Sequence, residues 1–343
     1  MANEFNLKKD LEVYLYDSTA AAGSQYLKLD VSEDVNFSQT FANSSYTTKT
    51  IHSQHLLHQT PNIKRANPAN FSFTIPLLQE NDLRVVFDRL VKFKTGTNTL
   101  QHFDLFFRYP TGDDDDIFKI ETCVITEGLF VINQAQPLLL SVSGEGTKLT
   151  RLDSSGRTAF ANAAVLPGAN NLATRSTTRT FQSLNFLELF YNSQTWPRNV
   201  SAISLELQND IEWTKNNTVH TGIATTDHAS TLYPSTFTLK ERKLGGSVTL
   251  YVDAELGSAI NEGNNLPQTW KQFAVSPAAG DSEAFRIKAG AVSDFSKGIK
   301  FVVPDHEITF TDRVTPEQVM IHNFDFSFTP VTSTNLDNIL TYN

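Results

Sequence analysis

Apolar and polar residues alternate in short runs along most of the chain, which is the pattern of half-buried β-strands. The runs at 27–31 (Leu-Lys-Leu-Asp-Val) and 71–75 (Phe-Ser-Phe-Thr-Ile) each place one face toward a core and one face outward. One segment, from about Glu80 to Lys92, has helical spacing instead. Its apolar face consists of Leu83, Val86, Phe87 and Leu90. The pattern therefore predicts a sheet covered by a single helix.

The same order of elements recurs in the second half of the chain. Leu15 to Ser18 (Leu-Tyr-Asp-Ser) is echoed by Phe190 to Ser193 (Phe-Tyr-Asn-Ser), and across six elements the shift stays between 175 and 183 residues. The aligned apolar sets are Leu27, Leu29, Val31, Val35 and Phe37 with Ile203, Leu205, Leu207, Ile211 and Trp213; Phe71, Phe73 and Ile75 with Val248, Leu250 and Val252; Leu83, Phe87 and Leu90 with Leu266, Trp270 and Phe273; Phe103 and Leu105 with Phe285 and Ile287; and Phe118, Ile120, Leu138 and Leu140 with Ile299, Phe301, Val319 and Ile321.

We therefore predict a mainly β protein of two tandem domains, each a β-barrel or sandwich with one flanking α-helix. The first domain is expected over residues 1–152 and the second over 181–343. Residues 153–180 are rich in Ser, Thr, Asn, Ala and Gly and lack alternation, so they are expected to be a linker. The alternative is two unrelated β domains with a similar strand rhythm.

Each copy contains one long, polar connection at an equivalent position, Gln39 to Asn70 and Lys215 to Gly246. Connections of this length are usually functional. We interpret each as an arm or extended hairpin that contacts a neighbouring subunit, with a plain surface loop as the alternative. The candidate inter-subunit residues are Thr50, Ile51, His52, Ser53, His55 and His58 in the first connection, and Thr218, Val219, His220, Thr221 and His228 in the second.

Charge and cysteine content narrow the class of protein. The formal net charge of −9 and the absence of a clustered basic patch disfavour a surface built to bind nucleic acid. The single cysteine, Cys123, cannot form an intramolecular disulfide and lies in an apolar run, so it is expected to be a buried core residue. No stretch approaches the roughly 18 apolar residues of a membrane span, so no membrane association is expected.

Taken together, the duplicated β domain, the flanking helix, the long connections and the acidic, Thr- and Asn-rich composition resemble the tail tube proteins of long-tailed phages, which share their fold with type VI secretion tube proteins. The tandem duplication resembles the T5-like subgroup, in which three chains give a ring of six domains. The resemblance covers nearly the whole chain, but it rests on the order of elements and not on a short motif.

The resemblance implies a structural virion protein of a phage tail, assembled in the host cytoplasm, whose stacked rings form a channel for DNA. Its partners would be further copies of itself, a tape-measure protein, a tail terminator and distal tail proteins. DNA would pass through the lumen without specific binding, and a neutral to acidic lining would favour this because it repels phosphates. The alternatives are the inner tube of a contractile tail and a baseplate or receptor-recognising tail protein.

Candidate chemistry elsewhere in the sequence is sparse. The run Asp113, Asp114, Asp115 and Asp116 supplies oxygen ligands but lacks the spacing of a known calcium loop, so a solvated acidic turn is the favoured interpretation. His52, His55 and His58 are spaced by three residues, yet nothing beside them completes a metal site, so a polar interface is favoured. No catalytic or phosphate-binding motif is present, and we expect a non-enzymatic protein without a cofactor.

Overall fold

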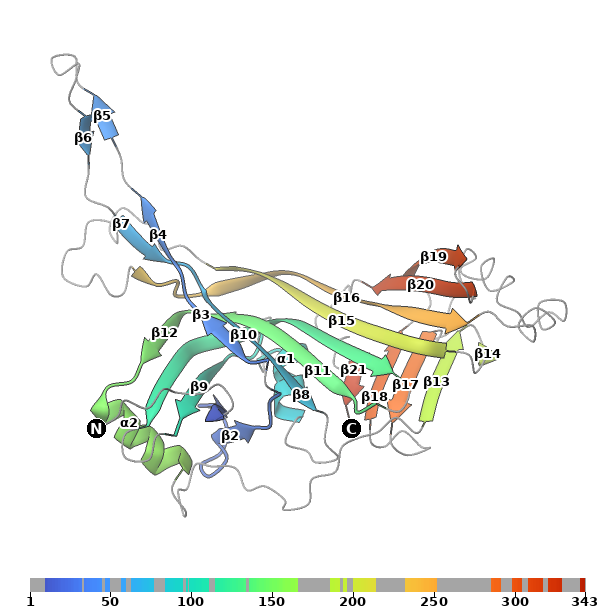
Figure 1. The fold of residues 1–343 in the computed structure, drawn as a ribbon, viewed down its shortest axis with the longest axis horizontal. Helices are drawn as coiled ribbons and strands as arrows, with labels where there is room; N and C mark the ends of the chain where they lie inside the picture. Colours follow the sequence, from blue (N-terminus) through green and yellow to red (C-terminus); the bar gives the residue numbers. More distant parts are fainter. Residues whose placement is uncertain are drawn as a thin grey trace.

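The computed structural model describes residues 10–32, 34–44, 47–49, 57–59, 63–76, 84–94, 97, 99–110, 115–133, 136–165, 186–191, 194–195, 200–213, 232–251, 285–290, 298–303, 308–316, 320–328 and 340–342. Over these residues the protein is mainly β, as the alternation predicts, and its large antiparallel sheets do not close into a barrel. Each half is a sandwich of two layers of strands around an apolar core (Figure 1).

One layer of the first half contains five strands in the order β2-β1-β9-β10-β12. Their bounds are β1 (Glu12–Tyr16), β2 (Tyr26–Leu29), β9 (Phe103–Tyr109), β10 (Asp116–Asn133) and β12 (Lys148–Arg151). The second half has a matching five-stranded sheet in the order β14-β13-β17-β18-β21. Its bounds are β13 (Phe186–Tyr191), β14 (Gln194–Thr195), β17 (Phe285–Gly290), β18 (Gly298–Val303) and β21 (Leu340–Tyr342).

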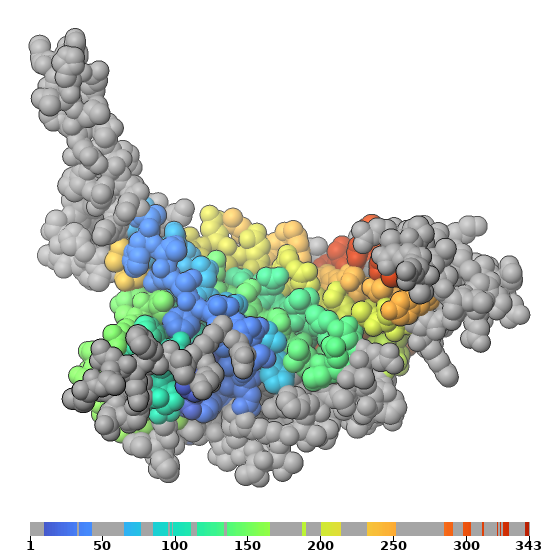
Figure 2. Space-filling view, in the orientation of Figure 1, coloured from blue at the N-terminus to red at the C-terminus, as the bar shows by residue number. Residues whose placement is uncertain are grey.

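The other layer is a single sheet that runs through both halves, in the order β19-β20-β16-β15-β10-β11-β8-β3. The first half contributes β3 (Asn36–Ser38), β8 (Ala69–Pro76), β11 (Leu139–Gly146) and the second part of β10. The second half contributes β15 (Val200–Trp213), β16 (Phe237–Tyr251), β19 (Ile308–Pro316) and β20 (Met320–Phe328). Figure 2 shows the blue and green strands of the first half against the yellow and orange strands of the second half.

Strand β10 belongs to both layers because it is irregular in its middle, where the register shifts against β9 between Ile120 and Cys123 and against β11 between Ile125 and Glu127. Its first part pairs with β9 and β12, and its second part pairs with β11 and β15. Within the first of these shifts Thr122 has a φ of 52°, and its N–H donates to Asp104 Oδ1 at 2.9 Å. A bulge of this kind redirects a strand, and here it carries the chain from one layer to the other.

Apolar side chains of both layers fill the core between them. Leu105 and Ile120 face each other across β9 and β10, and Phe71 of the other layer meets Phe103 with ring centroids 6.1 Å apart. Phe285 and Phe301 contact Phe326 in the same way in the second half. Cys123 is fully buried, as predicted. The core is thus held by alternate residues of each strand, which is how a sandwich is stabilised.

The helix predicted over 80–92 is α1 (Arg84–Val91) over the described residues, with Val86, Phe87 and Leu90 buried as expected. It lies where the two halves meet, because Phe87 contacts both Phe130 of β10 and Tyr342 of β21. Leu83 and the second predicted helix, around Leu266, Trp270 and Phe273, lie outside the described residues.

Part of the segment predicted as a linker is helical. Helix α2 (Ser154–Phe160) continues into one π-helical turn, η3 (Ala161–Val165). Asp153 caps α2 by accepting a hydrogen bond from the N–H of Gly156, and Phe160 stacks on Phe106 with centroids 4.9 Å apart. The helix forms because it has a cap at its start and an aromatic anchor at its end. Residues 166–185 lie outside the described residues.

The aligned pair Leu27 and Ile203 is not equivalent in the structure. Leu27 of β2 faces Leu15 of β1 in the five-stranded layer, whereas Ile203 of β15 faces Val248 in the continuous sheet. The strand next to β13 is β14, so β14 occupies the place of β2. The alignment of Leu27, Leu29 and Val31 with the second half is therefore wrong. So is that of Phe37 with Trp213, because Phe37 faces Phe71 whereas Trp213 faces Phe237. Leu140 is buried opposite Ile75, but its aligned residue Ile321 faces the exposed Tyr251, so this pair is also wrong. These alignments failed because alternation cannot tell one core-facing strand from another.

Candidate functional site

The first long connection forms an extended two-stranded arm. Its base is β4 (Phe41–Ser44) paired with β7 (Ile63–Ala66), and farther out β5 (Thr47–Lys49) pairs with β6 (Leu57–Gln59). Figure 1 shows these strands projecting away from the two layers. The hairpin geometry predicted for this connection is therefore present, while contact with a neighbouring subunit stays a prediction.

Most of the candidate inter-subunit residues fall outside the described residues. These are Thr50, Ile51, His52, Ser53, His55, Thr218, Val219, His220, Thr221 and His228. His58 lies in β6, for which the backbone pairing is described. The three histidines of the arm are therefore not brought together by any described contact.

The second connection, predicted over 215–246, is partly strand. Residues 237–246 belong to β16 and pair with β15 as far as Trp213, which faces Phe237. The segment has few apolar residues and several charges, so its sequence does not have the composition of a strand. It becomes one because β15 offers a continuous partner. Residues 214–231 lie outside the described residues.

Two of the four aspartates in the predicted acidic turn are described, and both bind arginines. Asp115 Oδ2 accepts from Arg108 Nε at 2.6 Å, and Asp116 Oδ1 accepts from Arg151 Nε at 2.6 Å. Asp113 and Asp114 lie outside the described residues. The two described aspartates of this turn therefore each form an ion pair on the five-stranded layer of the first half. A group of at least three metal-ligating side chains is not found in the described part of the chain.

The two halves join inside the continuous sheet, where β10 of the first half pairs with β15 of the second half. Strand β10 lies antiparallel to β15, with Phe130 opposite Leu205 and Ile132 opposite Ile203. Ile203 and Leu205 are 1% and 0% exposed, so the junction buries apolar residues as completely as a domain core. The pairing makes one continuous sheet from two similar sets of four strands.

A buried polar contact locks this junction to helix α1. Asn209 Nδ2 donates to the carbonyls of Leu90 and Ile125 at 3.2 and 2.9 Å. Arg242 Nη2 donates to the carbonyls of Leu90 and Val91 at 3.0 and 2.7 Å, and Arg242 Nε donates to Asn209 Oδ1 at 2.8 Å. The second half thereby satisfies the last carbonyls of the helix in the first half, which have no partner within the helix.

Sequence reasoning missed this lock, although one signal was present. Asn209 continues the apolar series Ile203, Leu205 and Leu207 at the same spacing, so it is a polar residue at a core-facing position. Such a residue must find a hydrogen-bond partner, and this requirement could have marked it as an interface residue. Arg242 lay in the segment interpreted as a loop, so its burial was not foreseen.

The two outer edges of the continuous sheet are β3 and β19. Among the described residues, no strand pairs with the second side of either one. The four strands of each half follow the same order in the sheet. Strand β3 of the first half therefore corresponds to β15 of the second half, and β19 of the second half corresponds to the second part of β10. The two unpaired edges are thus the counterparts of the two strands that form the junction.

A partly buried apolar side chain lies on the first of these edges. Phe37 of β3 lies opposite Phe71, as Ile203 lies opposite Val248, and its ring stacks on Phe107 with centroids 4.2 Å apart. Phe37 is only partly buried, whereas its counterpart Ile203, on a strand that pairs with β10, is 1% exposed. A strand paired with β3 would therefore bury Phe37 further, which is typical of an edge that binds another strand.

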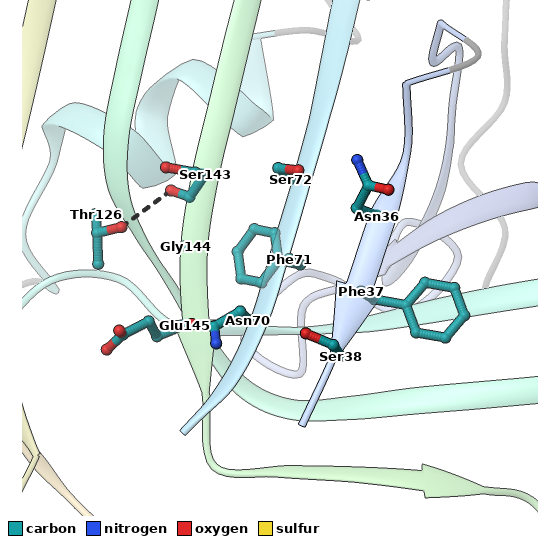
Figure 3. Close-up of a pocket in the computed structure, with 10 residues that line it drawn as sticks. All are labelled: Asn36, Phe37, Ser38, Asn70, Phe71, Ser72, Thr126, Ser143, Gly144 and Glu145. Atoms are coloured by element: carbon teal, nitrogen blue, oxygen red, sulfur yellow. Dashed lines mark hydrogen bonds between the residues drawn. The ribbon is translucent and has the colours of Figure 1, made fainter. Parts of the chain in front are cut away.

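The face of the continuous sheet opposite the core is polar. Figure 3 shows two rows across β3, β8 and β11, the first formed by Asn36, Ser72 and Ser143 and the second by Ser38, Asn70 and Glu145. They line a shallow groove of about 550 Å³. The same face continues over the second half, where Ser204 and Ser247 hydrogen-bond at 2.9 Å.

Charges on this face are mainly negative. Its carboxylates include Glu127, Glu145, Glu206 and Asp325, and its Lys243 is bound to Glu241 at 3.1 Å. The face therefore presents short hydroxyl and amide side chains among carboxylates. A surface of this kind offers a phosphate backbone few partners.

A second cavity, of about 380 Å³, lies beside the Leu-Tyr-Asp-Ser turn and is lined by Asp17, Thr19, Arg89, Lys94, Gln101 and His102. Arg89 of α1 forms a buried ion pair with Asp17 and donates to Gln101. Asp17 Oδ1 also accepts from the N–H of Thr19 at 2.8 Å. Burial lowers the pKa of His102, and Lys94 lowers it further. These contacts hold the turn against the helix, which explains why the motif stands out in the sequence.

No described helix is long and apolar enough to cross a membrane. No protein-family model matches the chain, and no curated protein matches it.

Proposed function

We propose that this protein is a structural subunit of a tube, similar in role to the tail tube proteins of long-tailed phages. Chains would join side by side into rings, three chains giving a ring of six similar halves, and rings would stack into a channel for DNA. The proposal carries with it the partners that the resemblance implies, namely further copies of the chain, a tape-measure protein, a tail terminator and distal tail proteins.

The observation that carries this proposal is the equivalence between the internal junction and the free edges. Strand β10 pairs with β15 inside the chain, and the counterparts of these strands, β19 and β3, have no described partner on their outer sides. The same pairing between β19 of one chain and β3 of the next would repeat the junction. A contact between two different surfaces of identical chains continues until it closes a ring or forms a filament.

The polar face of the sheet supports the second element of the proposal. If each junction turns the sheet in the same direction, one face of every half lies inside the ring. The face opposite the core carries Ser, Thr and Asn side chains among carboxylates, which suits a lumen through which DNA passes without binding. The core face is unsuited to a lumen because α1 and the five-stranded layers cover it.

The experiment is a matched pair of substitutions that place a lysine at an apolar position that is not fully buried in the chain. Phe37→Lys alters β3 at the counterpart of Ile203, which is 1% exposed in the internal junction, and Val131→Lys alters β10 in the middle of the polar face, where Val131 is 38% exposed. Purified wild-type protein and Val131→Lys should form rings or tubes by negative-stain microscopy. Phe37→Lys should stay a folded monomer by light scattering, with a critical concentration raised by roughly a hundredfold, because a charge would be buried at the junction.

Assembly by Phe37→Lys at the same concentration as Val131→Lys would show that this edge is not the contact. Wild-type protein that stays monomeric at high concentration would contradict the proposal that the chain forms a tube.

A further inference from the structure

The base of the arm is one place where the second half of the chain contacts the first outside the sheet. Strands β4 and β7 begin the arm, and Figure 1 shows them rising beside the ends of β15 and β16. In Figure 2, blue atoms of the first half border yellow and orange atoms of the second half in this region. A two-stranded hairpin is only marginally stable alone, so its direction must be set by contacts at its base.

Strands β15 and β16 form a second hairpin, and aromatic side chains at the end of this hairpin nearest the arm supply these contacts. Tyr233, which precedes β16, meets Phe41 of β4 with ring centroids 6.4 Å apart and an interplanar angle of 68°. Lys148 Nζ of β12 lies 5.2 Å from the centre of the Tyr233 ring. Tyr233 is thus held between two elements of the first half, one of which belongs to the arm.

The hairpin that carries Tyr233 is itself fastened to the first half. Trp213 Nε1, at the end of β15, donates to Glu145 Oε2 of β11 at 2.6 Å. The Trp213 ring packs on Phe237 across the hairpin, with centroids 5.5 Å apart. Trp213 is 8% exposed, so the donor of this hydrogen bond is largely buried, and the carboxylate acceptor makes the bond a charge-assisted one.

We propose that this end of the second hairpin, formed by Trp213, Tyr233 and Phe237, is a brace that fixes the direction of the arm. The inference rests on the proposed function, because the arm then presents a defined surface to the neighbouring ring. It also implies an order of folding steps. The brace comes from the second half and the arm from the first, so the arm is held in place only after both halves have folded and joined.

The brace is tested on the isolated chain by trypsin cleavage after Lys64 and Arg65 of β7. Tyr233→Ala removes the contact with Phe41, and Tyr251→Ala is the matched control, since Tyr251 is an exposed aromatic residue at the other end of β16. Cleavage in β7 should be about five-fold faster in Tyr233→Ala, because loss of an aromatic contact raises local opening, and unchanged in Tyr251→Ala. Trp213→Phe keeps the ring, removes the donor to Glu145, and should change cleavage in the same direction. Equal cleavage of Tyr233→Ala and Tyr251→Ala would overturn the brace.

Assembly provides a second readout that separates this inference from the proposed function. Tyr233→Ala should still form rings, because the free edges of the sheet are unchanged, but its tubes should be several-fold shorter than those of the wild type. Tubes of wild-type length would contradict a role for the brace in stacking. Wild-type protein that forms neither rings nor tubes would end the proposed function, while the cleavage experiment would still decide whether the brace exists.

Discussion

Individual buried polar residues determine how the two halves hold together. Asn209 and Arg242 are 2% and 6% exposed, and the guanidinium of Arg242 also lies 4.6 Å from the centre of the Phe93 ring. Hydrogen bonds offset the cost of burying polar groups, and these two side chains donate to the carbonyls of Leu90 and Val91 at the end of α1 and to that of Ile125 in β10. The two halves must therefore join in a geometry that makes these hydrogen bonds, a requirement that apolar packing alone would not impose.

Replacing Arg242 with methionine should destabilise the chain by about 3 kcal/mol, because the carbonyls of Leu90 and Val91 and the amide of Asn209 lose a buried partner. Lys243→Met on the opposite face of the same strand is the control and should change stability by less than about 0.5 kcal/mol. Denaturant unfolding measures both free energies. Equal effects of the two substitutions would mean that the lock contributes nothing.

Tyr342 makes stability sensitive to alkaline pH. Burial raises the pKa of its phenol from 10.0 to about 12. Because the folded state holds the proton more tightly than the unfolded state, the contribution is complete below pH 10 and is lost as pH rises toward 12. The loss should reach roughly 2 to 3 kcal/mol. Unfolding free energies measured from pH 9 to 12 should fall less steeply in Tyr342→Phe, and an unchanged slope would contradict this assignment.

At the level of elements, the strand pairs that continue the apolar alternation were predictable. Leu105 faces Ile120 in the first half, and their aligned residues Ile287 and Phe301 face each other in the second. Phe107 likewise faces Phe118, as Ala289 faces Ile299. The β9–β10 pair and the β17–β18 pair thus share one register at the shift read from the sequence.

The elements that were not predictable depend on partners distant in sequence. The strand character of residues 237–246 comes from β15, and the place of Ile203 comes from β10 and Val248. The lock of Asn209 and Arg242 was missed for the same reason. Local alternation gives the face of a residue but not its neighbouring strand, so the edges that form the candidate assembly surface could be recognised only from the strand order.

Helix α2 offers a test of an element that the sequence did not reveal. Phe160 anchors it in a cluster with Tyr14, Tyr26 and Phe106 on the five-stranded layer. Phe160→Ala should lower the unfolding free energy by about 3 kcal/mol, whereas Asp153→Ala, which removes only the cap, should lower it by a smaller amount. Thermal unfolding of the two variants should show this order, and the reverse order would mean that the anchor is not what holds the helix.

For the whole molecule, the strand order defines a polarity. Each chain ends its continuous sheet in two different edges, and the chain already contains one copy of the junction that these edges would make. The polar face and the braced arm then lie on defined sides of that sheet. If chains join by these edges as proposed, every chain would face the same way, which is what a stacked ring requires.

The most direct test of this account is electron cryo-microscopy of particles formed by the purified chain. The account predicts that β19 of one chain lies antiparallel to β3 of the next, so that the sheet passes from chain to chain as it passes from β10 to β15 within one. Particles in which β3 and β19 face solvent, or in which each edge pairs with its own copy, would contradict it.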